Sequence, residues 1–296
     1  MSALLSGKTS PTAKPAAAPV RWPGEAIWAA VQPTLPRFTV EILPQVDSTN
    51  SELMRRARAG QTDPLLLVAE RQSAGRGRLG RAWLSESPAA VGGAEPSPSL
   101  TFSIGVTLQR EDWSGLSLAV GVSVLTSLLD AARAAVGPLP DALPGLKWPN
   151  DLWWKGCKLG GILIESAGQG GPRHAVIGIG INIATPKAVD GAFSVPPVGL
   201  QALWPQVDAA QALLAIVPAL MAAVALFDRA GFGLFQAGFS ALDVLGDVAV
   251  RLSDGADGVA RGVDHRGALR VEAAGGVRLI DSGEISVRPL ALGAEN

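Results

Sequence analysis

Cysteine and histidine, the residues that most often build disulfides and metal sites, are scarce in this chain. Its 296 residues include one cysteine, Cys157, and two histidines, His174 and His265. A single cysteine excludes a disulfide framework and a cysteine zinc site, and it suits a reducing compartment. Two histidines are too few for a histidine-rich metal site. The sequence therefore predicts a cytoplasmic protein without these kinds of site.

Excess charge and long apolar runs are lacking as well. The net charge is −1, which argues against a general nucleic-acid binder because such proteins are normally basic. We find no uncharged run of about 18 apolar residues, so no membrane span is expected. The first residues lack the basic-then-apolar order of a secretion signal. With 48% apolar and 17% charged residues, the composition is that of a globular protein, and the length suggests two domains.

The N-terminal segment, residues 1–37, is rich in proline and alanine. Prolines stand at positions 11, 15, 19, 23, 33 and 36, and proline interrupts both helices and strands. We predict a disordered lead with one short helix over residues 25–32. That is too little for a three-helix DNA-binding domain, so no DNA binding is expected.

Hydrophobic periodicity predicts the elements of the remaining chain. Thr49 with Glu52 predicts a capping box, and Ser114 is the expected cap of the longest helix. His174 begins a strand, where we expect an ordinary surface histidine. Short strands from residue 243 onward indicate a small barrel. Predicted strands cover 38–43, 65–69, 100–108, 158–165 and 174–184, then 248–252, 259–263, 268–272, 277–280 and 284–287; predicted helices cover 53–59, 116–136 and 209–230, with a helical or turn-like stretch at 232–239.

One loop combines arginine and glycine in alternation. Arg76, Arg78 and Arg81 are separated by glycines at positions 75, 77 and 80. Glycine lets the backbone approach a ligand closely, and arginine offers a planar set of donors to phosphate or carboxylate oxygens. The loop is therefore typical of a mobile anion clamp.

The loop also fits two other patterns. Gly75-x-Gly77-x-x-Gly80 fits the dinucleotide-binding pattern, but no helix follows it and no acidic residue ends a second strand about 20 positions later. A plain solvated basic loop would predict no partner motifs elsewhere. Further motifs do exist, and they favour the clamp.

A second group of polar residues lies in Lys147-Trp-Pro-Asn150-Asp151. One cation, one amide and one carboxylate within five residues suit phosphate and Mg²⁺, although Pro-Asn-Asp is also good turn chemistry. Lys158 stands at the start of a predicted strand, just before a Gly-Gly pair and an apolar run. Ser48 and Thr49 stand at a helix start, where they either cap the helix or hydrogen-bond a small polar ligand.

Six stretches between about Val46 and Arg288 together resemble the bacterial biotin protein ligases, the biotin–[acetyl-CoA-carboxylase] ligases. Their joint occurrence, in order and at suitable spacing, is far more specific than any single motif. The resemblance implies an α+β fold, with a mixed-sheet catalytic domain of the class II synthetase and biotin–lipoate ligase type over residues 38–242 and a small SH3-like barrel over 243–296. The stretches are 48–50, 72–81, 147–152, 158–165, 178–182 and 283–288.

The resemblance also implies a reaction in two steps. Biotin and ATP give biotinyl-5'-AMP and pyrophosphate, and a lysine of a biotin carboxyl carrier protein then accepts the biotin. Mg²⁺ would come with the ATP phosphates, with Asp151 as a candidate ligand. The implied catalytic residues are Arg76, Arg78 and Lys158. The implied biotin-binding residues are Ser48, Thr49, Asn50, Gln72, Arg76, Gly77, Arg78, Lys158 and Gly160. The implied ATP and adenylate residues are Arg78, Arg81, Trp83, Lys147, Asn150, Asp151 and Asn182.

Two rival functions stay open at this stage. A lipoate or octanoate transferase has a similar fold, but the arginine–glycine loop and the Lys147 motif favour biotin. A repressor that uses biotinyl-AMP as corepressor is disfavoured by the proline-rich lead, which stands where repressor-type members carry a DNA-binding domain. The chain therefore resembles the monofunctional type. An insertion at 89–99 departs from the family pattern, and an exposed sheet edge suggests a homodimer.

Overall fold

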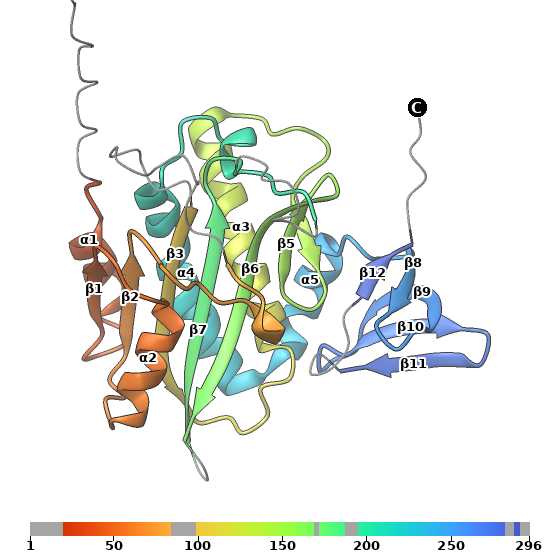
Figure 1. Ribbon diagram of the computed structural model, residues 1–296, viewed down its shortest axis with the longest axis horizontal. Coiled ribbons are helices and arrows are strands. Elements are labelled where there is room, and N and C mark those ends of the chain that lie inside the picture. The colour runs from red at the N-terminus through yellow and green to blue at the C-terminus, as the bar shows by residue number, and fades with distance from the viewer. Residues whose placement is uncertain (1–19, 84–98, 169–171, 187–194, 282–286, 291–296) are drawn as a thin grey trace, which may run out of the picture.

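The computed structural model describes residues 20–83, 99–168, 172–186, 195–281 and 287–290. Within these ranges a seven-stranded sheet and a smaller five-stranded sheet lie side by side (Figure 1). In the larger sheet the strand order is β1-β2-β3-β7-β6-β5-β4. Its first pair of strands is parallel and the other pairs are antiparallel, so the mixed sheet of the predicted α+β fold is confirmed. The strands are β1 Thr39–Leu43, β2 Leu65–Ala69, β3 Ser99–Leu108, β4 Gly145–Lys147, β5 Asp151–Trp154, β6 Cys157–Ala167 and β7 Arg173–Asn182.

Strand β3 shows how the sequence separates the two faces of this sheet. Leu100, Phe102 and Ile104 are buried in the main core, while Thr101 and Ser103 alternate with them. Because successive side chains of a strand point to opposite faces, the polar residues share the other face. That face carries the candidate site.

Helices cover both faces of the sheet (Figure 1). Helix α2, Thr49–Arg58, lies on the front, where Leu53, Met54 and Ala57 pack into a small cluster. Helices α3, Leu116–Val136, and α4, Ala209–Ala230, lie behind and bury the main core. The short helix expected near the N-terminus is α1, Gly24–Val31, and its Ile27 and Val31 are buried. Residues 1–19 lie outside the described ranges.

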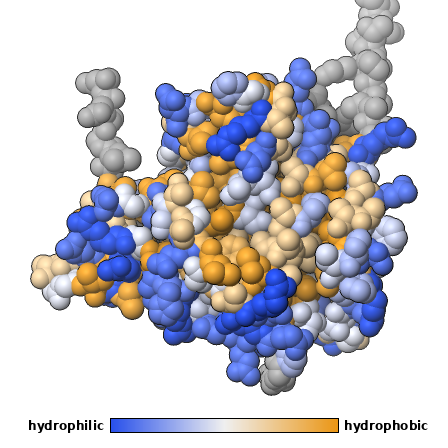
Figure 2. Space-filling view, turned by 180° about the vertical axis from the view of Figure 1, so that it is seen from behind, coloured by the Kyte–Doolittle hydropathy of each residue, from blue (hydrophilic) through white to orange (hydrophobic). Residues whose placement is uncertain are grey.

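Two long helices, α3 and α4, bear on the expectation that no segment spans a membrane. By length and composition alone, α3 and α4 are both long and apolar enough to cross a membrane. About half of each apolar window is nonetheless buried inside the molecule, 50% in α3 and 44% in α4. Figure 2, which shows the back of the molecule, has hydrophilic residues between its hydrophobic patches. Both helices therefore behave as core helices of the sheet domain.

The smaller sheet follows a 3-10 turn, Phe232–Phe235, and helix α5, Gln236–Leu242. Its strand order is β11-β10-β9-β8-β12, and its interior contains Val250, Ala260 and Leu269. The predicted run of short strands is therefore confirmed. Most of the last one, expected at 284–287, lies outside the described residues, and β12 includes its final residue, 287. The strands are β8 Ala249–Leu252, β9 Asp257–Val263, β10 Leu269–Ala273, β11 Gly276–Ile280 and β12 Val287–Pro289.

Direct contacts join the small sheet to the larger domain. The indole Nε1 of Trp148, a fully buried residue of the Lys147 motif, donates a hydrogen bond of 3.1 Å to the carbonyl of Gly267. The side-chain amide of Gln236 donates to the carbonyl of Val263 at 2.9 Å. These bonds place the small domain against the edge of the candidate site.

Two predicted helix caps are wrong by one residue. Helix α3 is preceded by Gly115 in the left-handed conformation rather than capped by the side chain of Ser114. At α2 the capping residue is Ser48, whose side chain accepts from the backbone N–H of Ser51. Thr49 does not cap because its hydroxyl contacts other side chains of the site.

His174 is not a surface histidine. Only 5% of its surface is exposed, and its Nδ1 lies 3.2 Å from the hydroxyl of Thr107 on the neighbouring strand. It lies on the sheet face that α2 covers, and Leu53 of that helix lies close by at Gly105. Burial lowers the pKa of His174. The periodicity of the strand could not show that helix α2 packs over this histidine.

A buried carboxyl group follows α5, at the start of the connection to the small domain. Asp243 accepts from the backbone N–H of Leu245 through Oδ1, while its buried Oδ2 has no hydrogen-bond partner among the described residues. Burial raises the pKa of Asp243 from 3.8 to about 6, and nearby Asp247 adds to the rise. The folded state therefore holds this proton more tightly than the unfolded chain does.

Asp243→Asn is expected to stabilise the protein at pH 8 by about 1 to 3 kcal/mol. A raised folded-state pKa gives stability that is present below the unfolded value and lost as the pH rises through about 6. Asparagine has no charge to bury, so it removes that loss. Urea denaturation at pH 8 and at pH 4 checks this, because the gain should vanish at pH 4. An equal gain at both pH values would contradict the ionisation argument.

Candidate active site

A large cavity opens on the front face of the sheet and extends to the small domain. Its volume is about 1240 Å³, which is above the usual range for a single small ligand. Its walls come from the start of α2, the arginine loop, strands β3 to β7 and the connection after α5. The cavity can therefore accommodate two small substrates side by side.

The arginine loop forms a compact hairpin over this cavity. Gly77 N–H donates to the carbonyl of Arg81 at 2.7 Å, and Trp83 N–H donates to the carbonyl of Gly75 at 2.8 Å. Between these bonds Leu79 has a positive φ of 56° and an exposed side chain. The backbone bonds turn the arginine side chains of the loop toward the cavity, which all three line.

The start of α2 forms one end of the cavity. Ser48, Thr49 and Asn50 are all buried there. The side-chain oxygen of Gln72 accepts from the backbone N–H of Thr49 at 2.7 Å and lies 3.1 Å from the hydroxyl of Thr49. Gln72 thus fixes the helix start against the arginine loop.

Asn50 lies flat across three neighbouring strands. The register places Ser103 of β3 beside Gly178 of β7, and Gly178 beside Leu163 of β6. The Asn50 amide accepts from the Ser103 hydroxyl at 2.6 Å and donates to the Leu163 carbonyl at 3.2 Å. A Cβ atom on Gly178 would lie 2.1 Å from Asn50 Oδ1, so only glycine leaves room for this amide. Gly178 is therefore a point where the strand backbone and the Asn50 side chain approach closely.

A carboxylate connects Asn50 to the arginine loop. Glu165 Oε2 accepts from Asn50 Nδ2 at 3.0 Å, and Glu165 Oε1 lies 3.2 Å from Arg76 Nη1. Arg76 also contacts the hydroxyl of Ser51 at 3.4 Å. Both amide hydrogens of Asn50 are therefore directed at protein acceptors.

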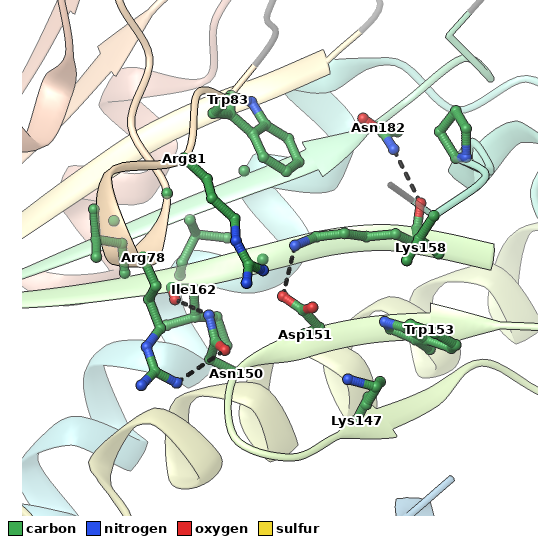
Figure 3. A pocket seen from close by; sticks show the side chains of 18 of the residues that line it. Arg78, Arg81, Trp83, Lys147, Asn150, Asp151, Trp153, Lys158, Ile162 and Asn182 are labelled. Carbon is green, nitrogen blue, oxygen red and sulfur yellow. Dashed lines mark hydrogen bonds and ion pairs between the residues drawn. The ribbon is translucent and has the colours of Figure 1, made fainter. Parts of the chain in front are cut away.

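The opposite end of the cavity contains the Lys147 motif and Lys158 (Figure 3). Lys158 Nζ donates to Asp151 Oδ1 at 2.7 Å across the β5–β6 pair. Asn150 donates to the carbonyl of Ile162 at 2.7 Å and accepts from Arg78 at 3.3 Å. One strand pair thus holds a cation and a carboxylate directly below the arginine loop.

Two tryptophans lie on the walls of this end. Trp83 lies over Gly180, where a Cβ atom would approach its ring to 2.5 Å, and its buried indole N–H has no partner among the described residues. Lys147 Nζ lies 5.1 Å from the ring centre of Trp153. Asn182 donates to the carbonyl of Lys158 at 3.1 Å and so supports the lysine's backbone (Figure 3).

The electrostatics of this end favour an anion. Burial lowers the pKa of Arg78, Asp151 opposes that change, and the neighbouring Arg81 adds to it. Arginine remains protonated in proteins nevertheless. Arg78 is therefore a partly desolvated cation beside a second cation, and such a pair gains most from a bound phosphate.

The described residues contain no group of three or more metal-binding side chains of the His, Cys, Asp and Glu types. Asp151 is the acidic residue on the cavity wall, and one of its oxygens bonds Lys158. One carboxylate plus substrate phosphates is the usual arrangement for Mg²⁺. The donor set thus fits a metal ion that arrives with a nucleotide.

The structure brings together almost all the site residues predicted from the sequence. Gly160 is the exception, because it faces the carbonyl of Gly180 within the sheet and does not line the cavity. Sequence reasoning assigned no role to Ser103 or Glu165. The polar alternation of β3 was the available signal for Ser103. The predicted residues on the cavity wall are Ser48, Thr49, Asn50, Gln72, Arg76, Gly77, Arg78, Arg81, Trp83, Lys147, Asn150, Asp151, Lys158 and Asn182.

Comparison with known protein families gives two matches that follow each other along the chain. The model of the biotin/lipoate A/B protein ligase family matches residues 42–182. The model of the biotin protein ligase C-terminal domain matches residues 248–288. The second match covers the small sheet and confirms the expected SH3-like domain of this family.

Individual proteins agree with these matches. The biotin–[acetyl-CoA-carboxylase] ligase of Mycobacterium tuberculosis is 33% identical over 83% of this chain and 88% of its own. The bifunctional ligase/repressor BirA of Escherichia coli is 32% identical over 84% of this chain and 74% of its own. Among solved structures, the biotin protein ligase of Aquifex aeolicus in complex with biotin and ATP has a TM-score of 0.68 and 26% identity, and it covers 84% of this chain and 98% of its own. The chain therefore belongs to the biotin protein ligase family.

Proposed function

We propose that this protein is an ATP-dependent biotin protein ligase. It activates biotin to biotinyl-5'-AMP and then transfers the biotin to a lysine of a biotin carboxyl carrier protein. The observation that carries this function is the single cavity of about 1240 Å³ in which the arginine loop, the start of α2 and the Lys158–Asp151 pair meet. Relatives at 33% and 31% identity are biotin–[acetyl-CoA-carboxylase] ligases.

In the first step the biotin carboxylate attacks the α-phosphate of ATP. A bond forms between a carboxylate oxygen and the phosphorus, and the bond from the phosphorus to the pyrophosphate oxygen breaks. Both reactants are anions, so cations must hold them together and stabilise the charge of the transition state. Arg76 and Arg78 of the loop and Lys158 of the sheet supply these cations.

In the second step the amine of the carrier lysine attacks the acyl carbon. An amide bond forms, the acyl–phosphate bond breaks, and AMP leaves with the electron pair. Lys158 stabilises the developing charge on the acyl or phosphate oxygen. Arg78 and Arg81 hold the adenylate and, together with the closed loop, exclude water that would otherwise hydrolyse it.

The two ends of the cavity take different substrates. The biotin end is formed by Ser48, Thr49, Asn50 and Gln72, with Gly77 in the loop above. The nucleotide end is formed by Trp83, Lys147, Asn150, Asp151 and Asn182, where Trp83 stacks on the adenine. Mg²⁺ bound to the ATP phosphates with help from Asp151 would neutralise the charge of the leaving pyrophosphate.

Intact-mass spectrometry of a biotin carboxyl carrier domain tests this function directly. The domain is incubated with the protein, Mg·ATP and either biotin or lipoate. We expect a mass increase of one biotin, which disappears when the acceptor lysine is replaced. A shift with lipoate alone would assign the protein to lipoyl transfer instead, and no shift with either acid would refute both activities.

The assembly of the protein is part of this proposal. Strand β1 is one edge of the seven-stranded sheet, whereas β4 at the other edge is bridged to Asp243 through Leu146. Pairing of two copies along β1 would give a homodimer. We place the protein in the cytoplasm, in keeping with its single cysteine. Light scattering at micromolar concentration checks the dimer, and a monomeric mass would contradict it.

Gly178→Ala is expected to weaken biotin binding by at least about tenfold. The new methyl group would stand 2.1 Å from Asn50 Oδ1 and so displace the side chain that orders the biotin end. Isothermal titration calorimetry measures the effect. Gly233→Ala is the matched control because a Cβ atom there meets no other atom within 4 Å. Unchanged biotin affinity in Gly178→Ala would show that Asn50 is not needed in this position.

A further inference from the structure

We propose that Ser103 and Glu165 are positioning residues that set the direction of the hydrogen bonds in the biotin end of the cavity. Through them Thr49 presents an acceptor, and not a donor, to the bound ligand. The proposal rests on the proposed ligase function and names the ligand group that is recognised, which is an N–H donor such as that of a cyclic urea. Neither Ser103 nor Glu165 lines the cavity.

The direction is set first at Asn50. An ionised carboxylate and a backbone carbonyl are acceptors only. Glu165 Oε2 lies 3.0 Å and the Leu163 carbonyl oxygen 3.2 Å from Asn50 Nδ2. A flipped amide would place its oxygen against both of these oxygens. The Asn50 amide is therefore held with its oxygen toward Ser103.

The orientation of the Asn50 amide then decides which way two neighbouring hydroxyl groups donate. Asn50 Oδ1 has no hydrogen, so its 2.6 Å contact with Ser103 uses the single hydroxyl hydrogen of Ser103. The hydroxyls of Ser103 and Thr49 are 2.7 Å apart. With its own hydrogen committed to Asn50, Ser103 can only accept in this contact. The single Thr49 hydrogen then points either to Ser103 or to Gln72 Oε1, 3.1 Å away, and in both cases it is directed at the protein. The remaining capacity of the Thr49 hydroxyl is a lone pair.

Arg76 links this chain of bonds to the clamp. Its guanidinium lies 3.2 Å from Glu165 Oε1, and its side chain is about half exposed, at 48%. The same carboxylate thus orients Asn50 and holds one arginine of the loop. Loss of the carboxylate would affect both the ligand wall and the clamp.

An acceptor fixed in this way discriminates between ligands. A cyclic urea supplies an N–H to the Thr49 lone pair, whereas a ring without N–H groups leaves that buried oxygen unpaired. Sites built on hydrogen bonds reject analogues that lack the matching group much more strongly than apolar pockets do. The bond chain therefore favours biotin over a dithiolane acid such as lipoate.

A double-mutant cycle on biotin affinity tests the chain of bonds. Calorimetry gives the biotin Kd of the wild type, Ser103→Ala, Thr49→Val and the double variant. We expect Ser103→Ala to weaken binding by about tenfold in the wild type and to have little further effect beside Thr49→Val. Equal effects of Ser103→Ala in both backgrounds would overturn the proposal, because they would show a purely structural role.

A second variant keeps the test independent of any folding defect at the buried Ser103. Glu165→Gln presents an amide that cannot accept from both Arg76 and Asn50, so its effect should also disappear beside Thr49→Val. Controls are Ser166→Ala, an exposed neighbour, and Glu272→Gln, which removes a carboxylate that bonds Arg261 in the small domain. If the effects of Glu165→Gln and Thr49→Val on biotin affinity are additive, the series of hydrogen bonds that starts at Glu165 does not extend to Thr49.

Steady-state kinetics give a readout that general loosening of the fold would not produce. Ser103→Ala should raise the KM for biotin about tenfold and leave the KM for ATP within about twofold, because the nucleotide end shares no bond with Ser103. A parallel rise of both KM values would overturn the assignment. A wild-type protein that binds no biotin would refute the ligase function itself, whereas biotin binding with additive effects would refute the bond chain alone.

Discussion

Replacing Lys158 with methionine is expected to slow adenylate formation by about 10²- to 10³-fold. The substitution removes the cation next to Asp151 on the cavity wall and leaves that carboxylate without its partner at 2.7 Å. The remaining carboxylate would then repel the incoming phosphates. Pyrophosphate release at saturating biotin and Mg·ATP measures the step.

Lys155→Met is the matched control for this experiment. Lys155 lies three residues earlier, in the turn between β5 and β6, and its exposed ammonium group lies 5.2 Å from the ring centre of Trp154. We expect its rate to remain within about twofold of the wild type. A Lys158→Met variant with a near-normal rate would remove Lys158 from the catalytic residues. Lys158→Arg separates charge from geometry, because arginine keeps the charge and cannot place it at the same point.

Arg78→Gly should leave the fold intact and weaken retention of the adenylate by about 10- to 100-fold. Arg78 lies in the loop, outside the hydrophobic core, and donates to the side-chain oxygen of Asn150 at 3.3 Å. What is lost is a partly desolvated cation that would contact the phosphate of the adenylate. Biotinyl-AMP that remains with the protein after rapid gel filtration measures retention, and carrier biotinylation measures transfer.

The result for Arg78 separates two roles of the loop. If the variant forms pyrophosphate at a normal rate and loses the adenylate, Arg78 acts in retention. If pyrophosphate formation falls by the same factor, Arg78 acts in the chemical step. Wild-type retention would refute the clamp. Arg133→Gly is unsuitable as a control because it lies within helix α3; Arg270→Ala, an exposed residue of β10, tests arginine loss in general.

Local sequence carried enough information for the elements with strong periodicity. Helices over 116–136 and 209–230 and the strand over 65–69 have the predicted bounds. In each of these elements the spacing of apolar residues and a flanking glycine or proline indicate the same type and the same bounds. Contacts with distant segments were therefore not needed to predict them. The motifs with unusual polar content likewise identified the walls of the cavity.

Contacts between distant segments could not be predicted in the same way. His174 was expected on the surface because its own strand starts there, yet helix α2, more than a hundred residues earlier, covers that face. Thr49 was expected to cap α2, yet its hydroxyl contacts Ser103 on a strand 54 residues later. The partners of Asn50 come from the same strand, β3, and from β6. The sheet register decides these contacts, and no local pattern reports it.

The bond between Trp148 and Gly267 has a consequence for how the molecule unfolds. It joins the Lys147 motif to the small domain through a fully buried indole. Separation of the two domains would leave that N–H without an acceptor inside a packed core, at a cost of about 1 to 3 kcal/mol. The barrel and the nucleotide end should therefore lose their amide protons to solvent exchange together, as one cooperative unit. Removal of the barrel would, on this view, loosen the ATP pocket without altering a single residue that faces it.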